Sequence, residues 1–230
     1  MTAPGARERD QDIDLLGCLT RVRVVPVVEI GQARHAVPLA FALADGGLTC
    51  LEITFRTAAA AEAIAAVAAE APEVLVGAGT VRTVEQVDMA VAAGARFLVA
   101  PGLSTAAVAR AAAHGVPMLP GVCTPTEVEQ AAGLGLRLLK FFPAEAAGGV
   151  AYLKALGGPF QDMRFVPTGG IGPGNLAAYL ELPLVAACGG SWMTPPPLVA
   201  AGDFAAVTRL AAEAAEIAGI HRRGRGRRCP

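Results

Sequence analysis

The sequence predicts an α/β fold, specifically an eight-stranded (β/α)₈ TIM barrel with an extra N-terminal helix. Short apolar runs rich in Val, Leu and Phe alternate with Ala-rich segments of helical character. About eight such alternations recur at intervals of roughly 20 to 28 residues, the length of one strand–helix unit. An open doubly wound sheet also alternates in this way but usually has about five or six strands, so it is the second choice.

The apolar runs and the segments between them place each expected element. An amphipathic segment from Asp12 to Leu19 precedes the first run, and we expect it to form the extra helix that closes one end of the barrel. We expect strands at Arg23 to Ile30, Leu48 to Phe55, Val74 to Thr80, Arg96 to Pro101, Pro117 to Val122, Leu136 to Phe142, Arg164 to Thr168 and Leu184 to Cys188. We expect helices at Gln32 to Ala44, Ala58 to Ala69, Val84 to Ala93, Thr105 to His114, Pro125 to Ala132, Val150 to Leu156, Gly174 to Leu180 and Phe204 to Ile217, several ending at a left-handed glycine, such as Gly46, Gly94, Gly115 and Gly133.

Composition indicates one folded domain with two short ends of different character. Hydrophobic residues make up 53% and charged residues 17% of the chain, which excludes a disordered protein. We expect a flexible arm at 1–11, a single barrel domain at 12–220 and a disordered Arg-rich tail at 221–230. The net charge of -1 gives the body no basic character for nucleic acid or an anionic membrane, although the tail by itself leaves a nucleic-acid contact open.

The cellular setting is predicted from what the sequence lacks. The first dozen residues have no apolar signal-peptide core, and no uninterrupted run of about 20 apolar residues suggests a membrane span. Five scattered cysteines without a CxxC spacing favour free thiols over a disulfide framework or a zinc site. A cytoplasmic protein is therefore expected.

The second strand carries a carboxylate toward the barrel interior. Strand alternation puts Cys50, Glu52, Thr54 and Arg56 on one face, and the apolar neighbours of these residues on the face toward the helices. A carboxylate inside a barrel is costly unless it is paired or has a chemical task. Active sites of such barrels lie at the C-terminal ends of the strands, so Glu52 and Arg56 are candidate site residues. The alternative is a structural ion pair at the rim.

Lys140 is the candidate nucleophile. The same alternation on the sixth strand puts Leu136, Leu138, Lys140 and Phe142 on one face. Apolar surroundings disfavour the ammonium form, and a neutral amine can attack a ketone to form an imine. Only two of the 19 basic residues are lysines, and an arginine would serve a purely electrostatic role here but not form an imine. The alternative is a lysine that reaches solvent from the strand end.

Glycine turns end the last two strands and predict a phosphate site. Gly169 and Gly170 follow Thr168 on the seventh strand, and Gly190 and Ser191 end the eighth. Phosphate sites in barrels are commonly built from these two loops with backbone N–H groups as donors. A third glycine pair, Gly77 and Gly79 before Thr80, lacks the full dinucleotide-binding spacing, which excludes an NAD site. No cluster of His and carboxylate residues predicts a metal.

Six motifs in the same order resemble one enzyme family. The chain from about Val24 to Leu210 resembles the 2-dehydro-3-deoxy-phosphogluconate (KDPG) aldolases and their relatives that act on 4-hydroxy-2-oxoglutarate (KHG). The resemblance rests on LEITFR at 51–56, GAGT at 77–80, PG at 101–102, KFFPAE at 140–145, PTGG at 167–170 and GGSW at 189–192. It leaves out the N-terminal arm and the tail.

The resemblance implies a class I aldolase on a (β/α)₈ barrel, without metal or cofactor, usually a homotrimer. It implies that Lys140 forms an imine with the substrate and that Glu52 acts as general acid and base. The reaction implied is cleavage of 2-dehydro-3-deoxy-6-phosphogluconate to pyruvate and glyceraldehyde 3-phosphate in sugar-acid catabolism of the Entner–Doudoroff type, with side activity on KHG that yields pyruvate and glyoxylate. The implied substrate-binding residues are Arg56 and Thr80 for the carboxylate, Pro101 and Phe142 as lining, and Thr168, Gly169, Gly170, Gly190 and Ser191 at the phosphate end.

Two other classes of function stay open from the residues alone. A phosphate-binding isomerase or epimerase on the same barrel uses glycine turns but needs no buried lysine. A non-catalytic metabolite-binding or nucleic-acid-binding protein would depend on the basic tail. The residues also leave open the choice among phosphogluconate, phosphogalactonate and hydroxy-oxoglutarate substrates.

Overall fold

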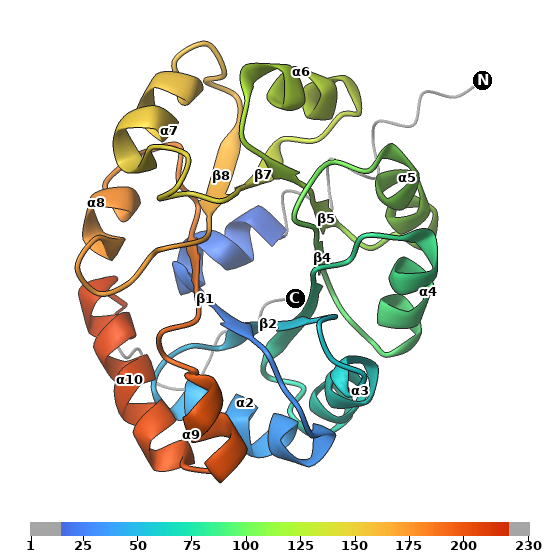
Figure 1. Cartoon of the computed structure of the whole chain (residues 1–230), viewed down its shortest axis with the longest axis vertical. Helices are drawn as coiled ribbons and strands as arrows, with labels where there is room; N and C mark the ends of the chain where they lie inside the picture. Colours follow the sequence, from blue (N-terminus) through green and yellow to red (C-terminus); the bar gives the residue numbers. More distant parts are fainter. Residues whose placement is uncertain (1–14, 221–230) are drawn as a thin grey trace.

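The computed structural model describes residues 15–220, and it shows a ring of parallel strands enclosed by helices (Figure 1). The strand segments are β1 (Val24–Val28), β2 (Cys50–Thr54), β3 (Leu75–Gly79), β4 (Leu98–Val99), β5 (Met118–Leu119), β6 (Gly121–Val122), β7 (Leu138–Phe141), β8 (Arg164–Pro167) and β9 (Cys188–Gly190). The predicted α/β barrel is confirmed.

The nine strand segments among the described residues occupy eight positions in the ring. β5 and β6 are one expected strand, interrupted at Pro120, which has no N–H to donate to a neighbouring strand. β1 pairs in parallel with both β2 and β9, and isolated bridges at Phe165↔Val185 and Thr168↔Gly189 join β8 to the last strand. These pairings close the sheet on itself, and they bring the loops after β8 and β9 together.

The helices surround the ring, and all but one lie close to where the periodicity predicts them. Helix starts carry local caps: Thr83, Ser104 and Thr124 each accept a hydrogen bond from a backbone N–H three residues on. The described helical elements are the 3₁₀ turn η1 (Ala33–His35), α2 (Ala36–Asp45), α3 (Ala60–Glu70), α4 (Val84–Ala92), α5 (Thr105–His114), α6 (Pro125–Gly133), α7 (Gly149–Gly157), α8 (Leu176–Leu180), α9 (Pro196–Ala201) and α10 (Phe204–Ile217).

Two expected glycine caps are wrong by one or two residues. Gly94 and Gly115 have the predicted positive φ, at 89° and 70°. After α2, however, Gly46 has a φ of -75° and the positive φ falls at Gly47. α6 continues through Gly133, and the left-handed glycine is Gly135. In both places the next glycine along the chain takes the left-handed conformation. The prediction was wrong because it placed this conformation at the first glycine after the apolar pattern.

Helix α9 and the position of the last strand were also not predicted correctly. No element was expected between Cys188 and Phe204, but α9 begins within the three prolines at 195–197, because the first turn of a helix tolerates proline. The last strand was expected at Leu184 to Cys188, but β9 is Cys188–Gly190. Glycines are poor strand formers, so the predicted strand ended at Cys188 and did not include Gly189 and Gly190, which pair with β1.

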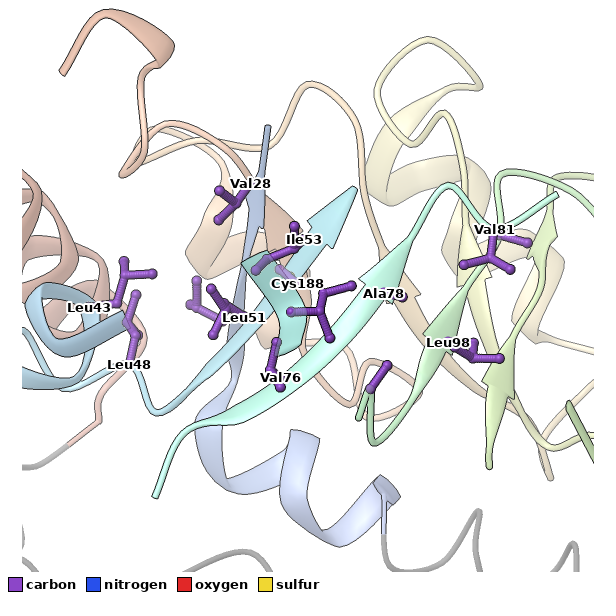
Figure 2. Packing of buried hydrophobic residues seen from close by; sticks show 14 of the residues in the cluster. Val28, Leu43, Leu48, Leu51, Ile53, Val76, Ala78, Val81, Leu98 and Cys188 are labelled. Atoms are coloured by element: carbon purple, nitrogen blue, oxygen red, sulfur yellow. The ribbon is translucent and has the colours of Figure 1, made fainter. Parts of the chain in front are cut away.

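Two apolar clusters hold the fold together. The outer cluster lies between the strands and the helices, and it includes Leu51 and Ile53 of β2 and Leu43 of α2 (Figure 2). The inner cluster fills the barrel at the N-terminal ends of the strands. It contains Cys50, Leu75, Phe97, Leu119, Leu138 and Val166, together with Leu15, Cys18, Leu19 and Val22.

The N-terminal helix closes this end of the barrel. Residues 15–22 are helical, and Leu15 and Leu19 pack against the inner cluster. This position confirms the expected extra helix for its described part, which extends three residues beyond the expected end at Leu19. Because the inner cluster and this helix fill the N-terminal end, the inward-facing polar side chains lie toward the opposite, C-terminal ends of the strands.

Strand alternation fails at one point on β7. Leu136 was expected on the same face as Leu138 and Lys140, but it belongs to the outer cluster. β7 begins only at Leu138, so the residues before it do not follow the two-residue period of a strand. Lys140 therefore shares the inner face with Leu138 rather than with two leucines.

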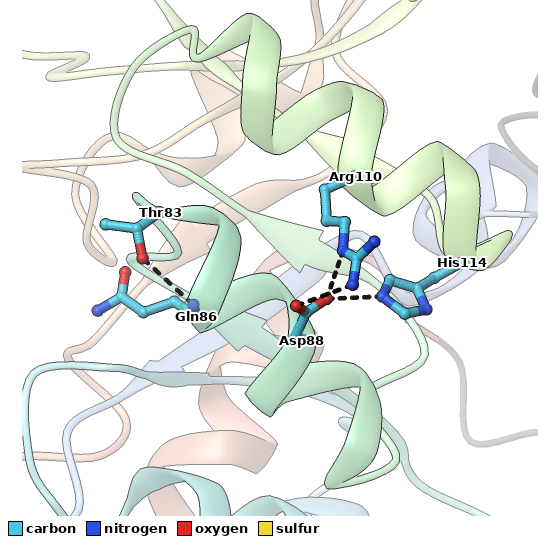
Figure 3. A network of polar contacts seen from close by, with 5 residues as sticks. All are labelled: Thr83, Gln86, Asp88, Arg110 and His114. Carbon is cyan, nitrogen blue, oxygen red and sulfur yellow. Dashed lines mark hydrogen bonds and ion pairs between the residues drawn. The ribbon is translucent and has the colours of Figure 1, made fainter.

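A surface network joins α4 to α5 on the outside of the barrel. The Asp88 carboxylate accepts hydrogen bonds from Arg110 Nε at 2.6 Å and Nη2 at 3.0 Å, and lies 2.7 Å from His114 Nε2 (Figure 3). The Arg110 guanidinium, and after it His114, lowers the pKa of Asp88 to about 2. This network links neighbouring helices and lies far outside the barrel interior.

Several expectations concern the ends, the thiols and the membrane. The expected arm at 1–11 and the Arg-rich tail at 221–230 lie outside the described residues. Cys50, Cys123 and Cys188 are free thiols as expected, whereas Cys18 is disulfide-bonded, which contradicts the expectation for that residue. Within residues 15–220, no helix is both long and apolar enough to cross a membrane.

Candidate active site

Two opposite charges lie inside the barrel. Glu52 is 3% exposed and Lys140 is 6% exposed, and no other charged residue in the described part of the chain is buried. Lys140 Nζ lies 3.7 Å from Glu52 Oε1. Burying either charge alone would be costly, so each supplies the partner that makes the other tolerable. The buried position rejects the alternative of a lysine that reaches solvent.

These two residues come from opposite parts of the ring. Glu52 lies on β2, in register with Val27 of β1 and Gly77 of β3. Lys140 lies on β7, in register with Gly121 of β6. β2 and β7 do not pair with each other, so the two side chains meet across the barrel interior.

Gly79 leaves room for the Glu52 carboxylate. A Cβ atom on Gly79 would lie 2.0 Å from Glu52 Oε1, so a side chain at this position would displace the carboxylate. Glu52 Oε1 is buried and has no hydrogen-bond partner among the described residues. Buried acceptors are normally satisfied, which marks this oxygen as a group that a substrate hydroxyl or a water molecule would complete.

Aromatic and backbone groups surround the lysine. Lys140 Nζ lies 5.1 Å from the centroid of the Phe142 ring, within range of a cation–π interaction. Pro101 follows β4, and its carbonyl group lies so close to Gly121 that a Cβ there would be 2.2 Å from the oxygen. Phe142 therefore lies beside the lysine, and Pro101 lies beside Gly121, the neighbour of the lysine in the sheet.

Arg56 occupies the rim rather than the interior. Its side chain is 61% exposed, and its Nη1 lies 2.8 Å from Oε2 of Glu29, the residue after β1. Arg56 was expected to point into the barrel mouth on the same face as Glu52. Instead the chain leaves the strand after Thr54, and the Arg56 N–H donates to the Thr54 carbonyl at 2.8 Å. The alternation rule does not hold beyond the end of a strand.

The residue after β3 has an unusual backbone. Thr80 has a φ of 58°, in the left-handed region that residues with a branched Cβ rarely adopt. Such conformations cost of order 1–3 kcal/mol and cluster at functional sites. Thr80 is half-buried next to Gly79, at the same end of the barrel as Glu52.

The two predicted glycine turns lie side by side. Thr168 bridges Gly189, which places the turn after β8 beside the turn after β9. Gly169 and Gly170 both have positive φ, at 101° and 79°, a region that glycine adopts at little steric cost. Gly190 is buried and Ser191 is exposed beside them. The structure therefore brings together the residues expected at a phosphate site.

The family of the chain follows from comparison with known proteins. The model of the KDPG and KHG aldolase family matches residues 16–210, which is most of the chain. The chain belongs to this aldolase family. The match includes both buried charged residues and both glycine turns.

Close relatives carry the names of both activities. The chain is 52% identical to the 2-dehydro-3-deoxy-phosphogluconate aldolase of Treponema pallidum, over 90% of this chain and 99% of that protein. It is 46% identical to the KHG/KDPG aldolase of Escherichia coli, over 86% of this chain and 93% of that one. The KDPG aldolase of Legionella pneumophila, solved with pyruvate captured as a covalent carbinolamine, is 40% identical with a TM-score of 0.83, and the match covers 86% and 96% of the two chains.

Three residues near this aldolase site were not predicted to have a role. Glu29 holds Arg56, Asn175 contacts the turn after β8, and Tyr179 donates to Glu145 of the KFFPAE motif. Glu145 was part of a motif, but Glu29 and Tyr179 lie in segments that read as ordinary strand and helix. No local pattern indicates a role for Glu29 or Tyr179, because the residue that each one contacts is distant in the sequence. Within the described part of the chain, no group of three His, Cys, Asp or Glu residues is placed to hold a metal ion.

Proposed function

We propose that this member of the aldolase family cleaves 2-dehydro-3-deoxy-6-phosphogluconate to pyruvate and glyceraldehyde 3-phosphate, with side activity on 4-hydroxy-2-oxoglutarate. The observation that carries the proposal is the buried pair of Lys140 and Glu52, 3.7 Å apart across the barrel. An isomerase or epimerase on the same fold would not need an amine in this position. Relatives with 46% to 52% identity are named for one or both of these reactions.

In the first step Lys140 attacks the C2 carbonyl carbon of the 2-keto acid. The neutral amine forms a C–N bond, and the carbonyl oxygen takes up a proton to give a carbinolamine. Loss of water then gives a protonated imine. Glu52 is the proton carrier in both directions, because its Oε1 lies near Nζ and has no other partner in the described structure.

In the second step the C3–C4 bond breaks. Glu52, directly or through water, accepts the proton of the C4 hydroxyl group, and the C4–O group becomes the aldehyde of glyceraldehyde 3-phosphate. The electron pair of the C3–C4 bond passes into an enamine conjugated to the Lys140 nitrogen. Protonation at C3 and hydrolysis of the imine then release pyruvate and restore the amine.

The binding groups are those that the family resemblance implies. Thr80 follows β3 and Arg56 follows β2, and both would hold the substrate carboxylate, for which Arg56 would exchange its contact with Glu29. Phe142 and Pro101 would line the site beside the reacting carbon. At the other side of the ring, the loops after β8 and β9 would hold the phosphate. Those phosphate-binding residues are Thr168, Gly169, Gly170, Gly190 and Ser191.

Reductive trapping tests the proposal directly. The full chain is treated with sodium borohydride in the presence of pyruvate, and the adduct is located by mass spectrometry of peptides. We expect a stable adduct of one pyruvate at Lys140 and none in Lys140→Arg, which keeps the charge but forms no imine. The surface lysine, Lys154, is the matched control: Lys154→Arg should trap pyruvate as the wild type does. Absence of an adduct in the wild type at any pyruvate concentration would overturn the proposal.

Assembly and location belong to the same proposal. We expect a homotrimer in the cytoplasm, working in sugar-acid catabolism of the Entner–Doudoroff type and needing no metal or cofactor. Analytical ultracentrifugation would decide the trimer, since a monomer at micromolar concentration would contradict it.

A further inference from the structure

A buried tyrosine on α8 faces the loop that follows the lysine strand. Tyr179 is 0% exposed, and its hydroxyl donates a short hydrogen bond to Oε1 of Glu145. Burial, and then the Glu145 carboxylate, raises the pKa of Tyr179 above its ordinary value, so the hydroxyl keeps its proton and remains a donor. The proposed chemistry uses neither of these residues.

Glu145 lies directly on the glycine turn after β8. Its N–H donates to the Gly169 carbonyl at 3.0 Å, and the preceding residue, Ala144, donates to the Thr168 carbonyl at 2.8 Å. A Cβ on Gly170 would lie 2.6 Å from the Glu145 Cβ, so the glutamate side chain covers the turn without any space between them. The position of Glu145 therefore sets the position of Gly169 and Gly170.

The same helix holds the turn from its other side. Asn175 precedes Tyr179 by one helical turn, its Oδ1 accepts from the Gly172 N–H at 2.8 Å, and its Nδ2 donates to the Gly170 carbonyl at 3.1 Å. The turn thus has one anchor to α8 through Asn175 and a second through Glu145 and Tyr179. Glu145 contacts Gly169 and Gly170, and Asn175 contacts Gly170 and Gly172, so the two anchors together cover the segment 169–172.

We propose that Tyr179 and Glu145 are positioning residues that hold the Gly169–Gly170 turn in the geometry that accepts a phosphate, and so set the preference for phosphorylated over unphosphorylated substrates. This inference rests on the proposed function. Backbone N–H donors bind an anion well only when they are fixed in advance, because ordering them at the moment of binding costs free energy. Neither residue belongs to the Lys140–Glu52 pair, so we expect the effect on substrate binding and not on bond cleavage.

The test compares two tyrosine variants on two substrates. Tyr179→Phe removes only the hydroxyl that reaches Glu145. Tyr152→Phe is the matched control, because the Tyr152 hydroxyl on α7 also makes a single bond, but to the Cys123 carbonyl at 2.9 Å and not to Glu145. For Tyr179→Phe we expect the KM for 2-dehydro-3-deoxy-6-phosphogluconate to rise roughly fivefold, the effect of about one hydrogen bond, with kcat unchanged. The kinetics with 4-hydroxy-2-oxoglutarate should stay at the wild-type level, and Tyr152→Phe should change neither substrate.

A double-mutant cycle tests whether the pair acts as a unit. Glu145→Ala should raise the same KM by at least as much as Tyr179→Phe, and the double variant should be no worse than Glu145→Ala alone. Additive losses would contradict a shared role. Equal losses for the phosphorylated and unphosphorylated substrates would also overturn the proposal, because they indicate general loosening of the site, and so would no change in any variant.

The outcome is separable from that of the proposed function. Trapping of pyruvate at Lys140 does not involve the phosphate end, so Tyr179→Phe should trap pyruvate as the wild type does. If the wild type traps pyruvate but the KM ratio of the two substrates is the same in Tyr179→Phe, only the positioning role is wrong. If the wild type traps nothing, the aldolase assignment itself fails.

Discussion

The barrel interior contains two layers that differ in chemistry although the same strands build both. On β2, Cys50 lies in the apolar inner cluster, and Glu52, the next inward-facing residue, lies in the site. On β7, Leu138 and Lys140 repeat this arrangement. Successive inward-facing residues of a strand are two positions and about 7 Å apart. The apolar layer and the layer of charged residues are therefore direct neighbours. The difference shows that a rigid apolar layer can directly support a pair of buried charges.

The glycines of β3 show what each layer requires. In the apolar layer the inward position is Leu75, which fills space, whereas at the level of the charged pair it is Gly79, which leaves space. The apolar layer is stabilised by close packing, whereas in the polar layer the absent side chain of Gly79 leaves its place to the Glu52 carboxylate. Four variants test this contrast.

The largest effect is expected in the polar layer. Glu52→Gln keeps the size of the side chain but removes the proton carrier, so kcat should fall by about 10²- to 10⁴-fold. Because Glu52→Gln leaves the buried Lys140 without its charged partner, some loss of unfolding free energy is also expected. Steady-state kinetics corrected for the folded fraction, with calorimetry on the same sample, separate the two effects. A kcat per folded molecule that stays near the wild-type value would mean that Glu52 is chiefly structural.

The apolar layer should give the opposite result. Leu138→Ala leaves a cavity beneath Lys140, and large-to-small changes of this kind cost about 2–5 kcal/mol of unfolding free energy. Urea titration measures this loss, and active-site titration with pyruvate and borohydride corrects the rate for the folded fraction. The kcat of the folded molecules should stay within a few-fold of wild type. A loss as large as that of Glu52→Gln would show that the two layers are not separable.

The boundary between the layers is tested at Gly79. Gly79→Ala places a methyl group where the Glu52 carboxylate lies, 2.0 Å from Oε1, and so must move it. Misplacing a catalytic group by about 1 Å can cost 10²-fold, and we expect a fall of about that size in kcat/KM. Gly133→Ala is the control, since a Cβ there meets nothing within 4 Å. Wild-type activity in Gly79→Ala would contradict the role assigned to Glu52.

The smallest effect is expected outside the barrel, at the Asp88 network. The folded pKa of Asp88 is lowered to about 2, so the network stabilises the fold above the unfolded pKa of about 3.9 and loses this contribution as the pH falls toward 2. Urea denaturation should show Asp88→Asn slightly less stable than wild type at pH 6 and equal to it near pH 2. The activity at neutral pH should not change. A difference that persists at pH 2 would require another cause.

Local sequence signals explain why the first and last residues of some helices were predicted correctly. Helices α5 and α10 begin after Ser104 and Asp203, whose side chains cap the first turn, and α5 ends at the left-handed Gly115. Caps act within four residues, so they are visible in the sequence. The errors lie where distant partners decide: Gly189 and Gly190 become strand because they pair with β1, and Leu136 faces outward because β7 begins after it.

The residues of the candidate site also fall into those that the sequence predicted and those that it did not. The resemblance of six motifs named Lys140, Glu52 and the glycine turns, and the structure places the two charges together and the two turns side by side. The sequence did not predict that Arg56 would pair with Glu29 at the rim. Nor did it indicate that Tyr179 would reach Glu145. The first contact joins residues that follow two different strands, and the second joins helix α8 to the loop after β7; both pairs are far apart in the chain.

By itself the sequence determined the alternation of strands and helices, the family, and the residue types that carry the chemistry, because periodicity, caps and motifs are local patterns. Only the tertiary structure decided that the lysine of β7 meets the carboxylate of β2 across the interior, that helix 15–22 fills the barrel end, and that α8 holds the glycine turn. Closure of the sheet is the physical reason, since ring closure sets distances between strands that no local pattern encodes.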